Sequence, residues 1–417
     1  MSSTASSPGV AIDAPTTWRV TFHRVWAALT VALFGAQIST LALPLGAALS
    51  LGASPLQMGL LVAAGEAPFL LCSLPCGVLV DRVRRWPLLI AADLSRAGLL
   101  SLIPLAALLG GLRLELLYVV AFLTGAGNVL FDVAHYAYIP ALVPRSELLR
   151  ANGRIQVSYS AAESAGPGLA GVLIQAVSAP LAMLATAGTY LISAALLGSN
   201  RRPETPASLS ATEGGMREAI MAGLRALLNQ PLLRPIVLTS AAIGVCQYAV
   251  RAVFVLYVTR ELGLDALQIG AILAVGGIAA APGGLLADRV GARFGSGPAI
   301  WGGWLGEGAA LLLLPFATPA TAIPLLVAAQ TLGGLAGTIA NVNQWSLRQT
   351  LTPDHLQGRV TASHRFLVYG AFPLGALLGG VLASAIGLRP ALFLGALGAT
   401  LLPLCLLRTP LRGRIGR

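Results

Sequence analysis

The stretch GVLVDRVRR covers residues 77–85 of the chain, and a similar stretch, GLLADRVGAR, covers residues 284–293. In both, an aspartate lies four residues after a glycine, an arginine follows it directly, and a long apolar run precedes the stretch. Asp81 and Asp288 are separated by about half of the 417-residue chain. A motif that recurs at half the chain length predicts two similar halves.

Further positions align at nearly the same offset. The aligned pairs are Asp132 with Asn341, Pro144 with Pro353, Arg150 with Arg359, Gly166 with Gly375 and Gly171 with Gly380. We therefore interpret the chain as an internal duplication.

The composition indicates a membrane protein. Hydrophobic residues make up 56% of the chain, charged residues only 10%, and the mean hydropathy is +0.79. Soluble domains carry about 25% charged residues, so a single soluble α/β enzyme is excluded. No P-loop, GxSxG motif or metal-ligand cluster occurs, so we expect no enzyme activity and no cofactor. Four cysteines in apolar runs lack the partners of a zinc site.

About 20 apolar residues span a bilayer as a helix, and twelve such runs can be distinguished. They cover 22–49, 57–80, 87–109, 115–141, 155–177, 180–199, 234–259, 267–288, 298–317, 321–345, 361–386 and 388–408. The sequence thus predicts an all-α integral membrane protein with twelve transmembrane helices in two pseudo-symmetric halves. The first run is too long for a signal peptide, so we expect an uncleaved span.

The predicted domains follow from these runs. They are a disordered N-terminus at 1–20, a six-helix half at 21–200, a linker at 201–233, a second six-helix half at 234–408 and a basic tail at 409–417. Ile220, Leu224, Leu227 and Leu228 are spaced as on one helix face, which predicts an amphipathic helix in the linker.

The basic residues predict the orientation. All 27 are arginines, against 16 acidic residues, and the net charge is +11. They are spread over many short connections, which follows the positive-inside rule and does not favour nucleic-acid binding. Only Arg113, Arg260 and Arg389 fall in the connections on the other side of the membrane, which carry few arginines. Both termini are expected in the cytoplasm.

The two turns resemble the hallmark G-x-x-x-D-R-x-G-R-R of the major facilitator superfamily, with Arg84 and Ala292 as departures. The resemblance implies rocking halves and a latch in which the aspartate caps a helix of the other half. The latch residues would be Gly77, Asp81, Arg82, Arg85, Gly284, Asp288 and Arg289. The alternative is that these arginines serve only the positive-inside rule.

The fifth predicted span resembles the antiporter motif of the superfamily. The matching residues are Gly153, Gly166, Pro167 and Gly171, with alanine at two other glycine positions. The motif favours export; ordinary close packing is the alternative. Span 4 lacks the arginine of the best-known drug–proton antiporters, and other segments resemble the branch of the enterobactin exporter and macrolide efflux proteins.

Ionisable residues within spans are costly, and therefore paired or functional. We expect Glu66 and Arg251 to form an outer gate, and Arg365 to meet Asp132 and Glu163 at an inner gate. Asp93 and Arg96, spaced i, i+3, are expected to neutralise each other. Glu307 is expected to be held locally by Trp301 or Trp304, or to be protonated, and receives no transport role.

Proton coupling requires a carboxylate that titrates near the working pH. Asp132 is the first candidate and Glu163 the second; His135 either relays the proton or is structural. The cavity is expected to contain amides and aromatic residues: Gln37, Asn128, Gln247, Tyr248, Asn341, Gln344 and Trp345.

These observations predict a secondary transporter that exports a bulky amphipathic small molecule, such as a drug, macrolide or siderophore, as a proton antiporter. A metabolite importer or facilitator, or a lipid flippase of the same fold, is the alternative. The expected partners are a small-molecule substrate and the lipid bilayer, with no nucleic acid. The expected location is the bacterial cytoplasmic membrane, compatible with the absence of Asn-x-Ser/Thr sequons, and the expected state is a monomer.

Overall fold

A computed structural model describes residues 17–199, 216–353 and 356–413, and these residues are helical with short connections and no strand. The N-terminal half contains α1 (Thr17–Leu45), α2 (Pro55–Arg82), α3 (Arg85–Leu108), α4 (Leu114–Leu142), α5 (Leu148–Val177) and α6 (Ala179–Gly198). A π-helical turn, Gly46–Ser50, extends α1.

The C-terminal half repeats this order with one broken span. It contains α8 (Leu233–Arg260), α9 (Ala266–Phe294), α10 (Ser296–Leu311), α11 (Ala322–Leu351), α12 (Gln357–Gly370), α13 (Phe372–Ile386) and α14 (Leu388–Leu401). A single span is divided into α12 and α13 at Ala371, where Pro373 follows in the first turn of α13. Proline has no backbone N–H to donate, which explains the break.

Eleven helical stretches of the described chain are long and apolar enough to cross a membrane, with α12 and α13 taken together. The remaining long helix, α5, has 30 residues but carries several polar residues in its first half. With α5 the described chain has twelve helical stretches of membrane-spanning length, the number that the sequence predicted.

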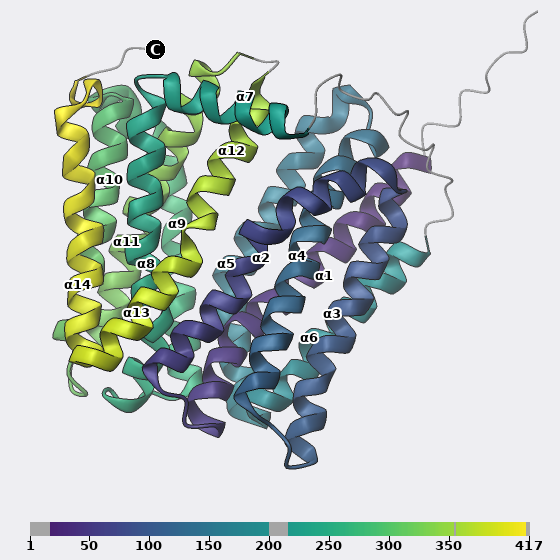
Figure 1. The fold of residues 1–417 in the computed structure, drawn as a ribbon, viewed down its shortest axis with the longest axis vertical. Coiled ribbons are helices and arrows are strands. Elements are labelled where there is room, and N and C mark those ends of the chain that lie inside the picture. The colour runs from purple at the N-terminus through teal and green to yellow at the C-terminus, as the bar shows by residue number, and fades with distance from the viewer. Residues whose placement is uncertain (1–16, 200–215, 354–355, 414–417) are drawn as a thin grey trace, which may run out of the picture.

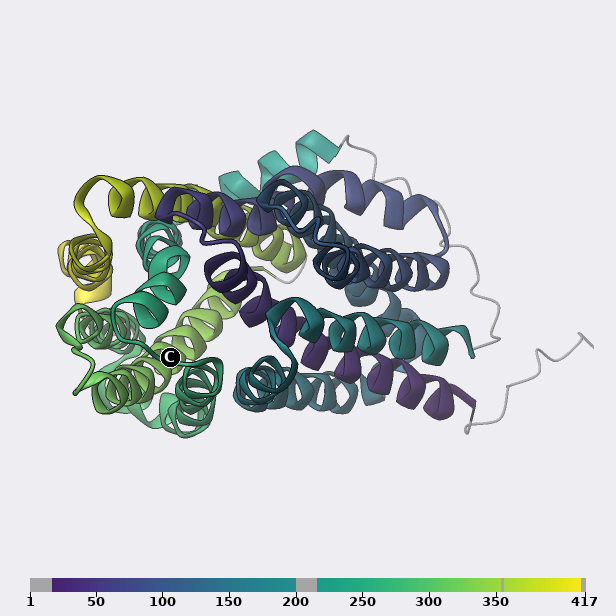
Figure 2. The same cartoon turned by 90° about the horizontal axis from the view of Figure 1, so that it is seen from below.

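The two halves lie side by side when the molecule is viewed from below (Figure 2). The beginning of α1, the end of α6, helix α7 (Met216–Asn229) and the short helical turn Pro410–Arg412 lie at one end of the bundle (Figure 1). The last turns of α2, with Arg82, and of α9 (Ala266–Phe294), with Arg293, belong to the same end, which we call the Arg-rich end. The other is the opposite end.

Matching helix starts reflect the duplication. Ser54 and Gln57 form a capping box at the start of α2, and Asp265 and Gln268 form one at the start of α9. Such caps satisfy backbone N–H groups that have no partner within the helix. The second helix of each half therefore begins with the same device, at the opposite end.

The hydrophobic core differs between the two ends. At the opposite end one cluster joins both halves and includes Leu41, Leu45, Leu256 and Tyr257. At the Arg-rich end the N-terminal half has its own hydrophobic cluster, which includes Phe22, and the C-terminal half has two further clusters. Besides the cluster at the opposite end, a small cluster of Ala63, Ala252 and Ala376 also joins the halves. At the Arg-rich end no core cluster of the described residues joins them.

Close contacts between glycines and the backbone of the other half close the opposite end. A Cβ at Gly171 of α5 would lie 2.6 Å from the carbonyl oxygen of Ala266 in α9, and one at Gly380 of α13 would lie 2.9 Å from that of Pro55 in α2. Gly171 and Gly380 occupy equivalent positions in the repeat. Only glycine allows the backbones to approach this closely, so the two halves meet through a pair of symmetry-related contacts.

The linker helix packs on the C-terminal half. In α7 the side chain of Leu227 is buried in a cluster with residues of α8 and α12, and a Cβ at Gly223 would lie 2.6 Å from the carbonyl oxygen of Arg359. A helix is therefore present where the apolar spacing predicted one. The terminal segments 1–16 and 414–417 and the linker segment 200–215 lie outside the described residues.

Candidate functional site: a cavity between the two halves

A cavity of about 610 Å³ lies between the halves. Its walls come mainly from α1, α2, α4, α8, α10 and α11, and apolar residues such as Leu41, Phe254 and Leu311 make up much of them. The polar lining residues include Gln37, Glu66, Thr124, Asn128, Gln247, Arg251, Glu307 and Gln330. This volume and this mixture are typical of a pocket for a small amphipathic molecule.

Three of the seven predicted cavity residues, Gln37, Asn128 and Gln247, line this cavity. Asn341, Gln344 and Trp345 do not, because α11 continues to Leu351 and these residues lie nearer the Arg-rich end. Gln344 is buried, and its Nε2 atom is 2.8 Å from Nε2 of His364 in α12, while Trp345 is exposed near Arg348. The prediction that Asn341, Gln344 and Trp345 line the cavity was therefore wrong.

The seventh residue, Tyr248, lies behind the cavity wall and joins two residues of the predicted outer gate. Its hydroxyl donates a 3.2 Å hydrogen bond to Glu66 Oε1, and Arg251 Nη1 donates a 3.2 Å hydrogen bond to the same hydroxyl. No direct ion pair joins Glu66 and Arg251 in the described chain. The Tyr248 ring stacks on Phe372 at 4.0 Å, which holds it in place.

The predicted antiporter motif contacts both the cavity and the other half. A Cβ at Gly166 would lie 2.5 Å from Cβ of Gln37, so the glycine makes room for this lining residue. Pro167 also lines the cavity, and Gly171 contacts α9. A Cβ at Gly153 would have no neighbour within 4 Å. Three of the four motif residues thus have a packing role between helices.

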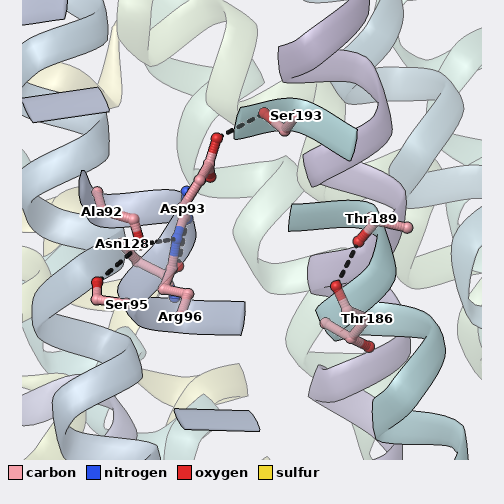
Figure 3. Close-up of polar contacts among 8 residues, drawn as sticks. All are labelled: Ala92, Asp93, Ser95, Arg96, Asn128, Thr186, Thr189 and Ser193. Carbon is pink, nitrogen blue, oxygen red and sulfur yellow. Dashed lines mark hydrogen bonds and ion pairs between the residues drawn. The ribbon is translucent and has the colours of Figure 1, made fainter. Parts of the chain in front are cut away.

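Asp93 and Arg96 form a buried ion pair on α3, as their spacing predicted. The hydroxyl of Ser193 on α6 donates a 2.6 Å hydrogen bond to Asp93 Oδ2 (Figure 3). Arg96 also donates a 2.8 Å hydrogen bond to Asn128 Oδ1, and its guanidinium lies 4.2 Å from the ring centre of Tyr190. The pair therefore connects three helices and holds a residue of the cavity wall.

Asp132 and His135 are neighbours on α4 but have different surroundings. Asp132 is half-buried, whereas the ring of His135 is buried, stacks against Phe131, and has no hydrogen-bond partner on either nitrogen. Asp132 has no ion pair within the described chain. A ring without a polar contact fits the structural alternative for His135 better than the relay.

Arg365, the predicted inner-gate cation, contacts the N-terminal half through a different residue. Its Nη2 donates a 3.3 Å hydrogen bond to the Tyr136 hydroxyl, and its guanidinium lies 4.9 Å from the centre of that ring. Glu163 is exposed, and among the described residues its carboxylate has neither a hydrogen bond nor an ion pair. The structure therefore brings Arg365 to α4, without direct pairing to either acid.

The two copies of the repeated Asp-Arg motif differ in their contacts. Arg85 donates a 3.0 Å hydrogen bond to the carbonyl oxygen of Ala137 in α4. In the second copy, Gly291 makes room for the side chain of Asn343, which donates a 3.0 Å hydrogen bond to the carbonyl oxygen of Ala287. Arg82, Asp288 and Arg289 are exposed, and the side chain of Asp81 lies outside the described residues. A Cβ at Gly77 would have no neighbour within 4 Å, and one at Gly284 would meet only the Thr338 side chain, at 3.9 Å.

Glu307 lines the cavity, which the sequence did not predict. Its carboxylate faces Gly337 of α11 and interacts with Gln247 of α8. The indole nitrogen of Trp301 is buried without a hydrogen-bond partner, so it does not hold Glu307 as expected. The signal in the sequence was the glycine-rich stretch 333–337, which leaves space beside an acidic residue on the preceding helix.

Comparisons with known proteins find bacterial efflux proteins among the relatives of this chain. Multidrug efflux pump Tap of Mycolicibacterium fortuitum is 29% identical over 353 residues, which are 81% of this chain and 83% of that protein. Macrolide efflux protein A of Streptococcus pyogenes is 28% identical over 156 residues, 37% of this chain and 38% of that protein. These two relatives support the efflux branch that the sequence resembled.

A solved structure supports the fold alone. The crystal structure of a bacterial homolog to the human lysosomal transporter Spinster, inward-facing and unoccupied, superposes with a TM-score of 0.74 at 15% identity and covers 97% of this chain and 99% of that chain. The sequence profile described as Major Facilitator Superfamily matches residues 25–376 and 252–414. The chain therefore belongs to the major facilitator superfamily, the family that its duplicated turn predicted.

Proposed function

We propose that this protein exports bulky amphipathic small molecules, such as drugs, macrolides or siderophores, across the bacterial cytoplasmic membrane. The observation that carries the proposal is the cavity of about 610 Å³ between two halves whose shared core clusters lie away from the Arg-rich end. A site closed at one end and enclosed by two repeats is what alternating access requires. The similarity to multidrug efflux pump Tap supports drugs as substrates.

The energy source in this proposal is the proton gradient. Asp132 and Glu163 are membrane carboxylates without an ion pair among the described residues, and carboxylates within membrane helices mark proton relays in transporters. The proposed cycle brings Arg365 toward Asp132 when the Arg-rich end closes. Protonation of Asp132 then weakens this attraction and favours the opening of that end.

Export by cells tests the proposed function. A host lacking its own efflux pumps, with and without the protein, is loaded with a panel of labelled drugs and macrolides. The proposal requires lower accumulation and higher resistance in cells with the protein, and loss of both after addition of an uncoupler. Higher accumulation of a compound would instead establish an importer or facilitator. Extrusion that persists with an uncoupler would remove the proton from the mechanism.

The proposed orientation places the Arg-rich end in the cytoplasm, with both termini, and the protein acts as a monomer. The arginines at the ends of α2 and α9 support this orientation through the positive-inside rule. Reporter fusions after Arg202 and Arg417 should be active in the cytoplasm, and one near Arg113 should be active outside. The reverse pattern would exchange the inner and outer gates.

A further inference from the structure

The charged residues of the cavity wall are not balanced. Glu66, Glu307 and Arg251 line the cavity. Arg251 and Glu66 are connected through the hydroxyl of Tyr248. Glu307 has no cationic group within 4.0 Å in the described chain. An ionised Glu307 would therefore leave the cavity with one negative charge in excess.

A gap in the neighbouring helix lets Glu307 reach the cavity from α10. A Cβ at Gly337 of α11 would lie 2.8 Å from the carboxyl carbon of Glu307 and 2.9 Å from each of its oxygens. Gly303 of α10 also packs tightly against α11, because a Cβ at this position would lie 2.7 Å from the carbonyl oxygen of Ala336. Any side chain at position 337 would occupy the space of the carboxylate, so glycine is required for this placement.

We propose that Glu307 binds the positively charged group of a monocationic amphipathic substrate. The apolar part of that molecule would lie against Leu41, Phe254 and Leu311, which line the same cavity. The proposal rests on the proposed function, because it names the substrate class that the exporter takes.

The chemical reason is the cost of an isolated charge away from water. A desolvated carboxylate without a counter-ion is strongly unfavourable and takes up a proton instead, whereas a bound monocation stabilises the ionised form. A neutral molecule of the same shape gains no ion-pair attraction from Glu307, and an anion is repelled. The cavity should therefore select by charge, with the apolar lining providing affinity that does not depend on charge.

Equilibrium binding to the purified full-length protein in lipid nanodiscs tests this selection. The probes are tetraphenylphosphonium, a monocation, and triphenylphosphine oxide, a neutral relative. Glu307→Gln keeps the size of the side chain and removes its charge. We expect it to weaken tetraphenylphosphonium binding at least about tenfold, equivalent to about 1.4 kcal/mol, and to leave binding of the oxide unchanged. Unchanged oxide binding also shows that the variant is folded.

A second pair of variants tests the geometry. Gly337→Ala places a methyl group against the Glu307 carboxylate, whereas a Cβ at Gly333, one turn earlier on α11, meets only Ala310 at 3.7 Å. Gly337→Ala should therefore weaken tetraphenylphosphonium binding and Gly333→Ala should not. Equal loss of both probes in Glu307→Gln, no loss of either, or failure of the wild type to bind tetraphenylphosphonium would overturn the proposal.

The two proposals can fail separately. If Glu307→Gln binds tetraphenylphosphonium as the wild type does while cells still extrude drugs, the cation site is wrong and the exporter stands. If binding depends on Glu307 but no panel compound is extruded, the cation site stands and the export function is wrong.

Discussion

Glu66 on α2 and Tyr248 on α8 are joined by a 3.2 Å hydrogen bond that crosses from one half of the protein to the other. The same tyrosine hydroxyl accepts a 3.2 Å hydrogen bond from Arg251. An acid and a base that the sequence suggested as direct partners are therefore connected through a third residue. Because this link spans the two halves, it must break or rearrange when they rock.

Tyr248→Phe should uncouple Glu66 from Arg251. Coupling is measured by a double-mutant cycle of Glu66→Gln and Arg251→Gln on the transport rate, and networked residues have coupling energies of about 0.5–3 kcal/mol. In the Tyr248→Phe background we expect this coupling to fall close to zero, because the bridging hydroxyl is gone. A coupling energy that is the same in both backgrounds would show that Glu66 and Arg251 interact without Tyr248.

The glycine contact between α5 and α9 should be intolerant of larger residues. Gly171→Val places atoms where the carbonyl of Ala266 lies, and overpacking costs about 1–3 kcal/mol. We expect the closed opposite end to be destabilised and efflux to fall several-fold. Gly168→Ala on the same helix is the control, because its Cβ would meet Ala274 at an ordinary 3.6 Å. Similar efflux by the two variants would show that this contact does not act as a gate.

Asp93→Asn should lower the stability of the whole N-terminal half. The substitution leaves Arg96 buried without its counter-ion, and breaking a buried ion pair costs about 3–5 kcal/mol. Thermal unfolding of the purified protein measures the loss. Ser193→Ala removes one hydrogen bond to Asp93 and should cost about 1 kcal/mol. Glu147→Gln in the more exposed pair with Arg150 is the control and should change little. If Asp93→Asn unfolded at the same temperature as this control, the contacts of Asp93 with Arg96 and Ser193 would not contribute to stability.

Asp132→Asn should separate binding from coupling. The amide resembles the protonated acid and cannot release a proton, so the variant should bind substrate and keep downhill exchange. Efflux driven by a pH gradient should fall to the level of wild-type vesicles treated with an uncoupler. Reconstituted vesicles measure both activities. Continued pumping by Asp132→Asn together with loss in Glu163→Gln would move the proton site to α5; continued pumping by both would require another coupling group.

The sequence by itself determined the fold. Twelve apolar runs of about the length that crosses a bilayer leave few alternatives to a helical bundle, and the turns around Asp81 and Asp288 identified the two halves and the family. The i, i+3 spacing of Asp93 and Arg96 was also sufficient to predict their pairing, because neighbours on one helix face meet whatever the tertiary packing.

Only the tertiary structure decided which residues of different helices meet. The sequence of a helical span shows how deep in the membrane a residue lies, but not which neighbouring helix it faces. The sequence therefore placed Gln344 in the cavity, whereas in the structure Gln344 contacts His364 and does not line the cavity. For the same reason Tyr248 was expected to contact substrate but bridges Glu66 and Arg251. Glu307 reaches the cavity because Gly337 leaves a gap on another helix. Packing between helices depends on such local gaps, and no periodicity within a single span reveals them.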